Sequence, residues 1–531
     1  MPRWKSTTTL AAITLIALAL LLAVVPSGRP LAPPLLAGGL LLLTRSAAGS
    51  LFGGSLLGAL LAAGSFWQAP SDWVTRYAWP SLTSSWHAAA MGYTLLLAAF
   101  AAVVERSGAI SALLARWTRS ATSSSRFETS VVLLGLFCFF DGLANALMLG
   151  RVGRKLADQS GVSREKLAYL VDTTSSAVAC VAFISTWSVV QLSLIGEALS
   201  TMDSPPAAYL VFLRSIPLNF YCLLSLILVF LAAKWGWNPP PMARAKPLSA
   251  STHSTPARQI AKPLTPALGP LLVLLLSVPL SFWILGNPGR ILPSSTKDIQ
   301  LAFSTSKGPW ALILAGLLSL SGAILFYPGS RREVWPAILE GMRSMLPALL
   351  VLLMAWTLGA TLGELGTAKT LATQLGDNLA ARWLPGATFI LACLIAFATG
   401  SSWGTMSLLI PIALGTLLSL AANQDLPPAE LQALLPAVTA AVFGGAVFGD
   451  HASPFSDTTI VSAMACDVTT TRHVATQLPY ALTAGGIAIA VGYLPTAFGL
   501  SGWASLLLAT AVLIVIVRST RPRWGTGEAA L

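Results

Sequence analysis

The stretch Gly449-Asp450-His451-Ala452-Ser453-Pro454-Phe455-Ser456-Asp457-Thr458-Thr459 interrupts an otherwise apolar part of the chain. It carries two carboxylates, one imidazole and four hydroxyls. A carboxylate at membrane depth costs roughly 3 kcal/mol or more, so an acid in such a position is a functional candidate by default. The polar groups of this stretch are therefore the starting point for the function.

The same stretch predicts a break in a helix. Ser453-Pro454 is typical of an N-cap followed by proline at the first helical position. We therefore expect a helix to begin there, with Asp457 in its first turn and Asp450 and His451 in unwound backbone just before it. Irregular backbone at that depth persists only where it lines a cavity or is buried in protein. A broken helix surrounded by oxygen ligands is typical of the ion site of a secondary transporter.

Composition predicts an all-α polytopic membrane protein. The chain has 531 residues, of which 55% are hydrophobic and 10% charged, and its mean hydropathy is +0.73. Soluble proteins carry about 25% charged residues. The net charge of +12 lies in short loops, where it sets topology, so we expect a lipid bilayer and no nucleic acid as partner. No nucleotide, zinc or haem signature stands out, so we expect a protein that is not an enzyme and that binds no cofactor.

Hydropathy and charge divide the chain into six parts. We expect scaffold helices over 1–85 and 265–342, repeats over 86–233 and 343–496, a basic cytoplasmic linker over 234–264, and a last helix with a cytoplasmic tail over 497–531. The apolar run 9–25 lacks a convincing cleavage site, so it is interpreted as a retained helix with its N-terminus in the cytoplasm.

Three short matches predict that the two halves are repeats. Glu105-Arg106-Ser107-Gly108 resembles Glu364-Leu365-Gly366, and the same offset carries Asp141 onto Gly400. Asp172-Thr173-Thr174 then matches Asp457-Thr458-Thr459. Each match alone is weak, but their shared order indicates an internal repeat.

Loop charges predict that the repeats are inverted. The loops 105–126 and 151–166 are both basic, so the run 128–150 between them is expected to enter and return, with Asp141 at the tip of the hairpin. The loop 421–434 contains no Lys or Arg and is expected outside. Opposite flanking charge favours inverted topology, with the tips meeting near the midplane.

Four segments supply oxygen ligands, which hard monovalent cations prefer. They are centred on Asp141 with Asn145, on Asp172–Ser176, on Gly400–Thr405 and on the opening stretch. The alternative for each is structural: a polar packing bridge, an N-cap cluster, a small-residue packing motif or a capped helix end. A buried carboxylate that holds a proton and releases it to an arriving cation would exchange the two ions. The five cysteines are interpreted as packing residues.

At these residues the sequence resembles the NhaC-type Na+/H+ antiporter family of the ion-transporter superfamily. The matching segments span about 88–495 and are Phe139-Phe140-Asp141 with Ala144-Asn145, Ser163–Tyr169 running into Asp172, Ser185-Thr186-Trp187, Thr399–Thr405, Ser453–Thr459, and His473 with Thr476–Tyr480. The family often has a second acid directly after the first, where this chain has Gly142.

The resemblance implies sodium-for-proton exchange by a core that moves against a scaffold. We expect the protein in the cell inner membrane, and flanking charge predicts that both termini are cytoplasmic. We expect sodium at Asp141, Asp172 and Asp457, with further ion-binding candidates at Asn145, Thr173, Ser401, Ser402, Thr405, Asp450, Ser453, Ser456 and Thr458. His451 and His473 are proton-relay candidates. A Na+- or H+-coupled carrier of organic anions and a non-transporting scaffold or receptor stay open, as does a homodimer.

Overall fold

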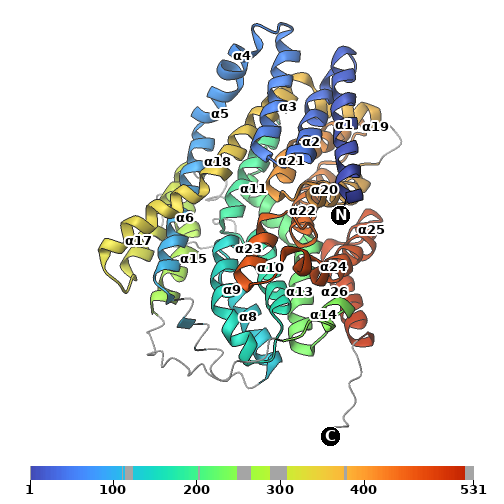
Figure 1. The fold of residues 1–531 in the computed structure, drawn as a ribbon. Helices are drawn as coiled ribbons and strands as arrows, with labels where there is room; N and C mark the ends of the chain where they lie inside the picture. The colour runs from blue at the N-terminus through green and yellow to red at the C-terminus, as the bar shows by residue number, and fades with distance from the viewer. Residues whose placement is uncertain are drawn as a thin grey trace.

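The computed structural model describes residues 2–520 apart from 110–111, 114–115, 117–122, 201, 203, 248–264, 287–307 and 376–379. More than half of the expected linker over 234–264 lies outside these residues. The described part is helical throughout and contains no strand (Figure 1). Its helices are α1 (Pro2–Val24), α2 (Ala32–Thr44), α3 (Ala47–Ala63), α4 (Ala69–Asp72), α5 (Trp79–Thr83), α6 (Ser85–Arg106), α8 (Ser124–Phe137), α9 (Gly142–Gln159), α10 (Arg164–Val181), α11 (Thr186–Leu199), α12 (Ala208–Ser215), α13 (Phe220–Trp235), α14 (Pro240–Ala243), α15 (Thr265–Gly286), α17 (Gly308–Leu325), α18 (Val334–Leu365), α19 (Thr367–Leu375), α20 (Leu384–Thr399), α21 (Ser402–Asn423), α22 (Pro428–Ala452), α23 (Asp457–Cys466), α24 (Thr470–Ile487), α25 (Leu494–Ala497) and α26 (Gly502–Ser519).

Many of these helices are built to cross a membrane. Nine in the described part are long and apolar enough, and the bent pair α10 and α11 would make a tenth span. The predicted all-α polytopic fold is confirmed.

A hairpin is present where one was predicted over 128–150, but its helices α8 and α9 together span 124–159, so the predicted basic loop from 151 begins as part of α9. Its open end is closed by the Ser124 hydroxyl, which donates to the Ser160 carbonyl over 2.7 Å, so the chain returns to the end from which it came. Asp141 is the N-cap of α9, and its carboxylate accepts a hydrogen bond from the Ala144 amide at 2.7 Å. An acid at an N-cap satisfies backbone donors that the helix itself cannot.

A second hairpin, α20 and α21, has the same design. At its open end the Ala381 amide donates to the Gln424 side chain over 3.3 Å. At its tip Gly400 ends α20 in the left-handed region, with φ of 69°, which glycine adopts without a Cβ penalty. α8 and α9 lie in the lower half of Figure 1 and α20 and α21 in the upper half. Inverted topology requires such a placement, although the inversion itself stays a prediction.

A helix pair interrupted by four residues follows each hairpin: α10 and α11 are separated at 182–185, and α22 and α23 at 453–456. Each hairpin tip contacts the break of its own half. The Thr186 amide donates to the Phe140 carbonyl at 3.0 Å, and the backbone of Gly400 packs on that of Phe455. The order of hairpin and broken helix therefore recurs in both halves.

This order corrects the third sequence match. Asp172 lies in the middle of α10, before the first break, whereas Asp457 is the first residue after the second break. The two acids are thus not equivalent in the two halves. α21 and α22 have 22 and 25 residues against 18 each in α9 and α10, so an alignment by three short motifs lost register.

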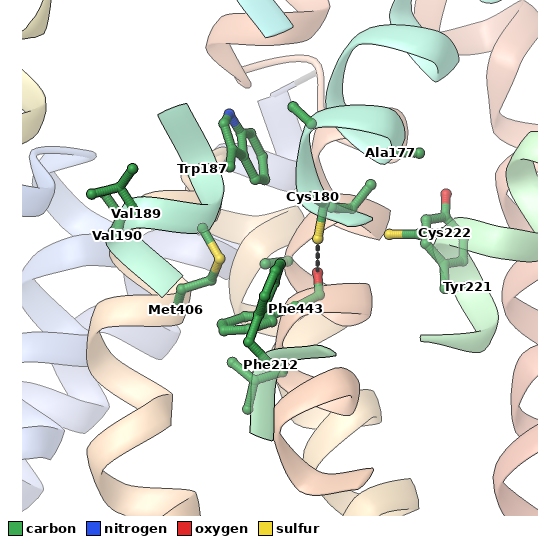
Figure 2. Close-up of a cluster of buried hydrophobic side chains, with 14 of the residues drawn as sticks. Ala177, Cys180, Trp187, Val189, Val190, Phe212, Tyr221, Cys222, Met406 and Phe443 are labelled. Carbon is green, nitrogen blue, oxygen red and sulfur yellow. Dashed lines mark hydrogen bonds between the residues drawn. The ribbon is translucent and has the colours of Figure 1, made fainter. Parts of the chain in front are cut away.

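α10 is the centre of the molecule. Every residue from 165 to 180 is buried, although the helix contains Glu165, Lys166 and Asp172. Figure 2 shows how its end meets the second half: Cys180 points toward the Phe443 carbonyl of α22, beside Met406 of α21 and Tyr221 of α13. A helix buried all round must satisfy its polar side chains within the protein.

Small residues bring the second hairpin close to α22. A Cβ on Gly445 would lie 2.5 Å from Ala392 of α20, and one on Gly449 would lie 2.2 Å from Ala396. Such spacing of small residues allows helix backbones to approach closely in membranes. On the other side of the molecule, α18 packs against α3 and α6, and α17 packs against α6 and α15.

Candidate cation-binding site

The end of α22 corrects the predicted break. The helix continues through Asp450 and His451 to Ala452, and Ser453 is its C-cap. The next helix begins at Asp457, after Ser456 as N-cap. Proline disfavours helical conformation in the residue before it and offers no amide to continue the ladder, so Ser453-Pro454 ends one helix instead of starting another. Asp457 is in the first turn of α23, as predicted.

Asp450 is fully buried and only partly satisfied. Its Oδ1 accepts a hydrogen bond from the Ser456 hydroxyl over 2.8 Å, while Oδ2 has no partner. The Thr459 hydroxyl donates to the backbone carbonyl oxygen of Asp450. Ser402, at the start of α21, lies beside the carboxylate, close enough to interact with it, although its buried hydroxyl makes no hydrogen bond of good geometry. The charge of Asp450 therefore faces a place where a cation would find oxygen ligands.

The residues after the break extend this group of oxygens. The Ser456 hydroxyl lies 3.1 Å from that of Thr458, and the Thr458 amide donates to Oδ1 of Asp457 at 2.9 Å. The Asp457 side chain is exposed. Asp450, Asp457 and Asp172 are close enough to interact electrostatically. These three acids form one cluster, which we call the break cluster.

Asp172 has the most donors of the three. Its Oδ1 accepts from the Ser462 hydroxyl at 3.1 Å and its Oδ2 from the Gln477 amide at 2.6 Å. The ring of His473 lies 3.3 Å from Oδ2, within ion-pair distance. The carboxylate is fully buried between α10, α23 and α24. The alternative of an N-cap cluster at the membrane edge is thereby excluded for Asp172.

The two histidines occupy different positions. His451 Nδ1 lies 2.7 Å from the Tyr221 hydroxyl and Nε2 lies 2.9 Å from that of Ser176, so its ring is held on both sides. His473 is buried beside Asp172, without a hydrogen bond of good geometry at either ring nitrogen. Of the two relay candidates, His473 is the one in contact with an acid.

The other hydroxyl candidates are divided between structure and site. Ser401 is the N-cap of α21 and accepts from the Gly404 amide, while Thr405 donates to the Ser401 carbonyl. Ser453 accepts from the Phe455 amide. Thr173 lines a small cavity with His451. The first three therefore shape the hairpin tip and the break, and Ser402 alone of the tip hydroxyls makes no hydrogen bond of good geometry.

Asp141 lies apart from the break cluster. Its two oxygens accept from Ala144 and, at 3.1 Å, from the Thr186 hydroxyl, both in the first half. Asn145 donates to the Gly135 and Thr174 carbonyls, which ties α8, α9 and α10 together and leaves its Oδ1 unpaired. The predicted acids are therefore not all brought together where the hairpin tips were expected to meet.

Asp141 instead lines a cavity of about 520 Å3 between α6, α9 and α18. Four further charged side chains line it: Glu105, Arg151, and the pair of Arg106 and Glu340, which lie 2.7 Å apart. From the sequence, Glu105 is interpreted only as part of the repeat match, and Arg151 only as one charge of a basic loop. Nothing in the chain order signals that α18 completes this cavity.

Sequence reasoning also missed how much α23 and α24 contribute to the break cluster. Ser462 and Gln477 both bind Asp172. One signal was present: His473 and Gln477 are four residues apart and share a helix face. Ser462 carries no such signal.

Comparisons with known proteins point to transport. A model of the Na+/H+ antiporter family matches residues 178–498. The chain is similar to an uncharacterized protein of Haemophilus influenzae, with 30% identity over 442 residues, which cover 81% of this chain and 82% of the relative.

Two shorter matches have more informative names. An uncharacterized Na+/H+ antiporter of Haemophilus influenzae is 29% identical over 167 residues, 30% of this chain and 33% of that protein. A malate-2H+/Na+-lactate antiporter of Bacillus subtilis is 30% identical over 182 residues, 34% of each. Among solved structures, the YdaH transporter of Alcanivorax borkumensis superposes with a TM-score of 0.50 at 18% identity, covering 84% of this chain and 89% of that one, a likeness of fold alone.

Proposed function

Because this chain belongs to the Na+/H+ antiporter family, we propose that it exchanges Na+ for H+ at the break cluster. It is a multi-pass membrane transporter and not an enzyme. The single observation that carries the exchange is the carboxylate of Asp450, which is buried between a hairpin tip and a helix break, with Oδ2 in no hydrogen bond of good geometry and the Ser402 hydroxyl beside it. A buried carboxylate normally has strong partners, so one that is only loosely held suits an ion that comes and goes.

Electrostatics supplies the coupling. A bare carboxylate in a low-dielectric interior is costly, so Asp450 needs either a cation or a proton with it. Na+ would take oxygens from Asp450, Ser402 and Ser456, with Asp172 close enough to add attraction. A proton on the same carboxylate removes the charge that binds Na+. Mutual exclusion of the two ions then gives exchange without a further device.

We propose that the two hairpins and broken helices move as one body against α6 and α18. The cavity at Asp141 lies along that boundary, with Glu105 on α6 and Glu340 on α18. Small residues line both sides of this boundary, Ala98 and Ala102 on α6 and Ala144 on α9, so the helices can slide without large side chains in the way. The basic residues Arg106 and Arg151 at this cavity favour the cytoplasmic side. We propose that both termini lie on that side and that the protein is in the inner membrane.

The test is transport by the purified protein in proteoliposomes that contain a quenched pH dye and hold an imposed proton gradient. Na+ is expected to dequench the dye in a saturable way, and K+ and Li+ are added separately to define selectivity. Asp450→Asn is expected to abolish the response while the protein still reconstitutes. A full response in Asp450→Asn would overturn the assignment of this site, and no response to any cation in the wild type would overturn exchange itself.

A second function is supported by one observation, the presence of Arg151 in the cavity with Asp141. A guanidinium binds carboxylates well, and about 520 Å3 accommodates a small organic acid. The similarity to an antiporter named for malate and lactate supports the same reading. Uptake of labelled small carboxylic acids under a Na+ gradient, lost in Arg151→Gln, would establish this carrier in place of simple exchange.

A further inference from the structure

A second, smaller cavity lies behind the break cluster and is not explained by cation exchange. It measures about 10 Å3, which is about the room one water molecule needs. α10, α13, α22 and α24 enclose it with Tyr169, Thr173, Ser225, His451, Gln477 and Tyr480. The lining is thus mostly polar and deeply buried.

Three buried polar atoms in this lining make no hydrogen bond of good geometry in the protein. They are the hydroxyls of Tyr169 and Ser225 and Oε1 of Gln477, on side chains that are at most 4% exposed. Both N–H groups of the Gln477 amide are used, one on Asp172 Oδ2 at 2.6 Å and one on the His451 carbonyl at 3.1 Å. Its oxygen therefore needs a donor from another source.

We propose that this cavity holds one ordered water molecule that donates to Gln477 Oε1 and accepts from the Tyr169 hydroxyl. Ser225 and Thr173 provide further partners, and buried waters typically make about three hydrogen bonds to such otherwise unsatisfied groups. The lining contains no carboxylate, which favours water over a cation. The ring of Tyr169 is fixed by stacking on Tyr480, with centroids 3.9 Å apart, so its hydroxyl is presented in a constant place.

The water makes Gln477 a positioning residue for Asp172. With its oxygen satisfied, the amide keeps its N–H toward the carboxylate. Without the water, Oε1 is left unsatisfied, so the amide is held less firmly in the orientation that presents its N–H to Asp172. This role rests on the proposed cation exchange, whereas the water site itself does not.

The test fills the cavity with Ser225→Val, whose extra methyl group takes up the space. In density maps fine enough to show ordered water, the wild type and Ser225→Ala are expected to show a peak between Tyr169 and Gln477, and Ser225→Val is expected to lack it. In transport, Ser225→Val is expected to raise the half-saturating Na+ concentration about tenfold with little change in maximal rate. Ser419→Val is the matched control on α21, away from the cavity.

Tyr169→Phe is the second variant, in case Ser225→Val does not fold. It removes the hydroxyl but keeps the stacked ring, and it is expected to weaken the peak and move half-saturation in the same direction. A wild-type map without the peak, or a peak that strengthens when Tl+ replaces Na+, would overturn the water. A peak that disappears in Ser225→Val with half-saturation unchanged would overturn the positioning role and leave cation exchange intact.

Discussion

The hydroxyl of Ser456 donates to Oδ1 of Asp450 over 2.8 Å, across the break between α22 and α23. The other oxygen of the same carboxylate has no partner. One half of the acid is thus fixed in orientation, and the other half is open to a ligand. The break thus places the N-cap residue of the following helix against an acid near the end of the preceding one.

Removing that donor should weaken cation binding without destroying the site. Hydrogen bonds to charged groups contribute about 1.5–3 kcal/mol, so Ser456→Ala is expected to raise the half-saturating Na+ concentration by roughly tenfold or more. The measurement is dye dequenching against Na+ concentration. Ser419→Ala, which removes a hydroxyl bonded only to its own helix, is the control. Equal affinities in both variants would show that Ser456 does not orient Asp450.

The contact between the second hairpin tip and the break should tolerate no side chain at Gly400. A Cβ there would lie 2.6 Å from the backbone of Phe455, and the left-handed conformation adds its own strain. Together these cost about 2–4 kcal/mol. Gly400→Ala is expected to lower the melting temperature in detergent and to reduce exchange strongly.

Gly486→Ala is the comparison for that experiment. Gly486 lies within α24, and no atom outside its own stretch of helix lies within 4 Å of the position of its Cβ. This variant is expected to melt and transport like the wild type. If Gly400→Ala behaves in the same way, the tip does not depend on its packing against Phe455.

Competition between Na+ and H+ sets the expected pH dependence. A proton on the binding carboxylate excludes Na+, so each Na+ bound displaces a proton. At pH values where that carboxylate is mostly protonated, the half-saturating Na+ concentration is expected to rise about tenfold for each unit of falling pH. At higher pH it should level off. Initial exchange rates measured over a range of pH provide the curve, and a half-saturation that does not vary with pH would mean separate sites for the two ions.

Inverted topology predicts that the open ends of the two hairpins face opposite sides of the membrane. Gln159 at the end of α9 and Asn423 at the end of α21 are both exposed. In a variant without the five native cysteines, Gln159→Cys and Asn423→Cys are expected to react with a membrane-impermeant maleimide from opposite faces. Labelling of both from the same face would rule out inversion.

Local chemistry explains which parts of the fold could be predicted. The hairpin around Asp141 followed from two basic loops flanking one apolar run, and the break near residue 454 followed from proline among acids. The position of Asp450 did not follow, because Ser-Pro fits either a helix start or a helix stop. Only packing against α20, through Gly445 and Gly449, shows that α22 continues to the acid.

Long-range assembly explains what could not be predicted. Asp172 meets Gln477 across 305 positions of sequence, and no periodicity links them. Likewise, Asp141 faces a cavity completed by α18, which is distant in the chain. The match of Asp172 with Asp457 failed because the helices between the hairpin tip and the break differ in length between the two halves. Motifs therefore identified the chemistry, while the grouping of the acids required the structure.

The most direct test of cation exchange at the break cluster is the number of protons released for each Na+ bound. Calorimetric titration of the detergent-purified protein with Na+, in two buffers of different ionisation enthalpy, measures that number without transport. The wild type is expected to bind Na+ with release of a proton, and Asp450→Asn is expected to show neither. Binding of Na+ to Asp450→Asn with wild-type affinity and the same proton release would contradict the site.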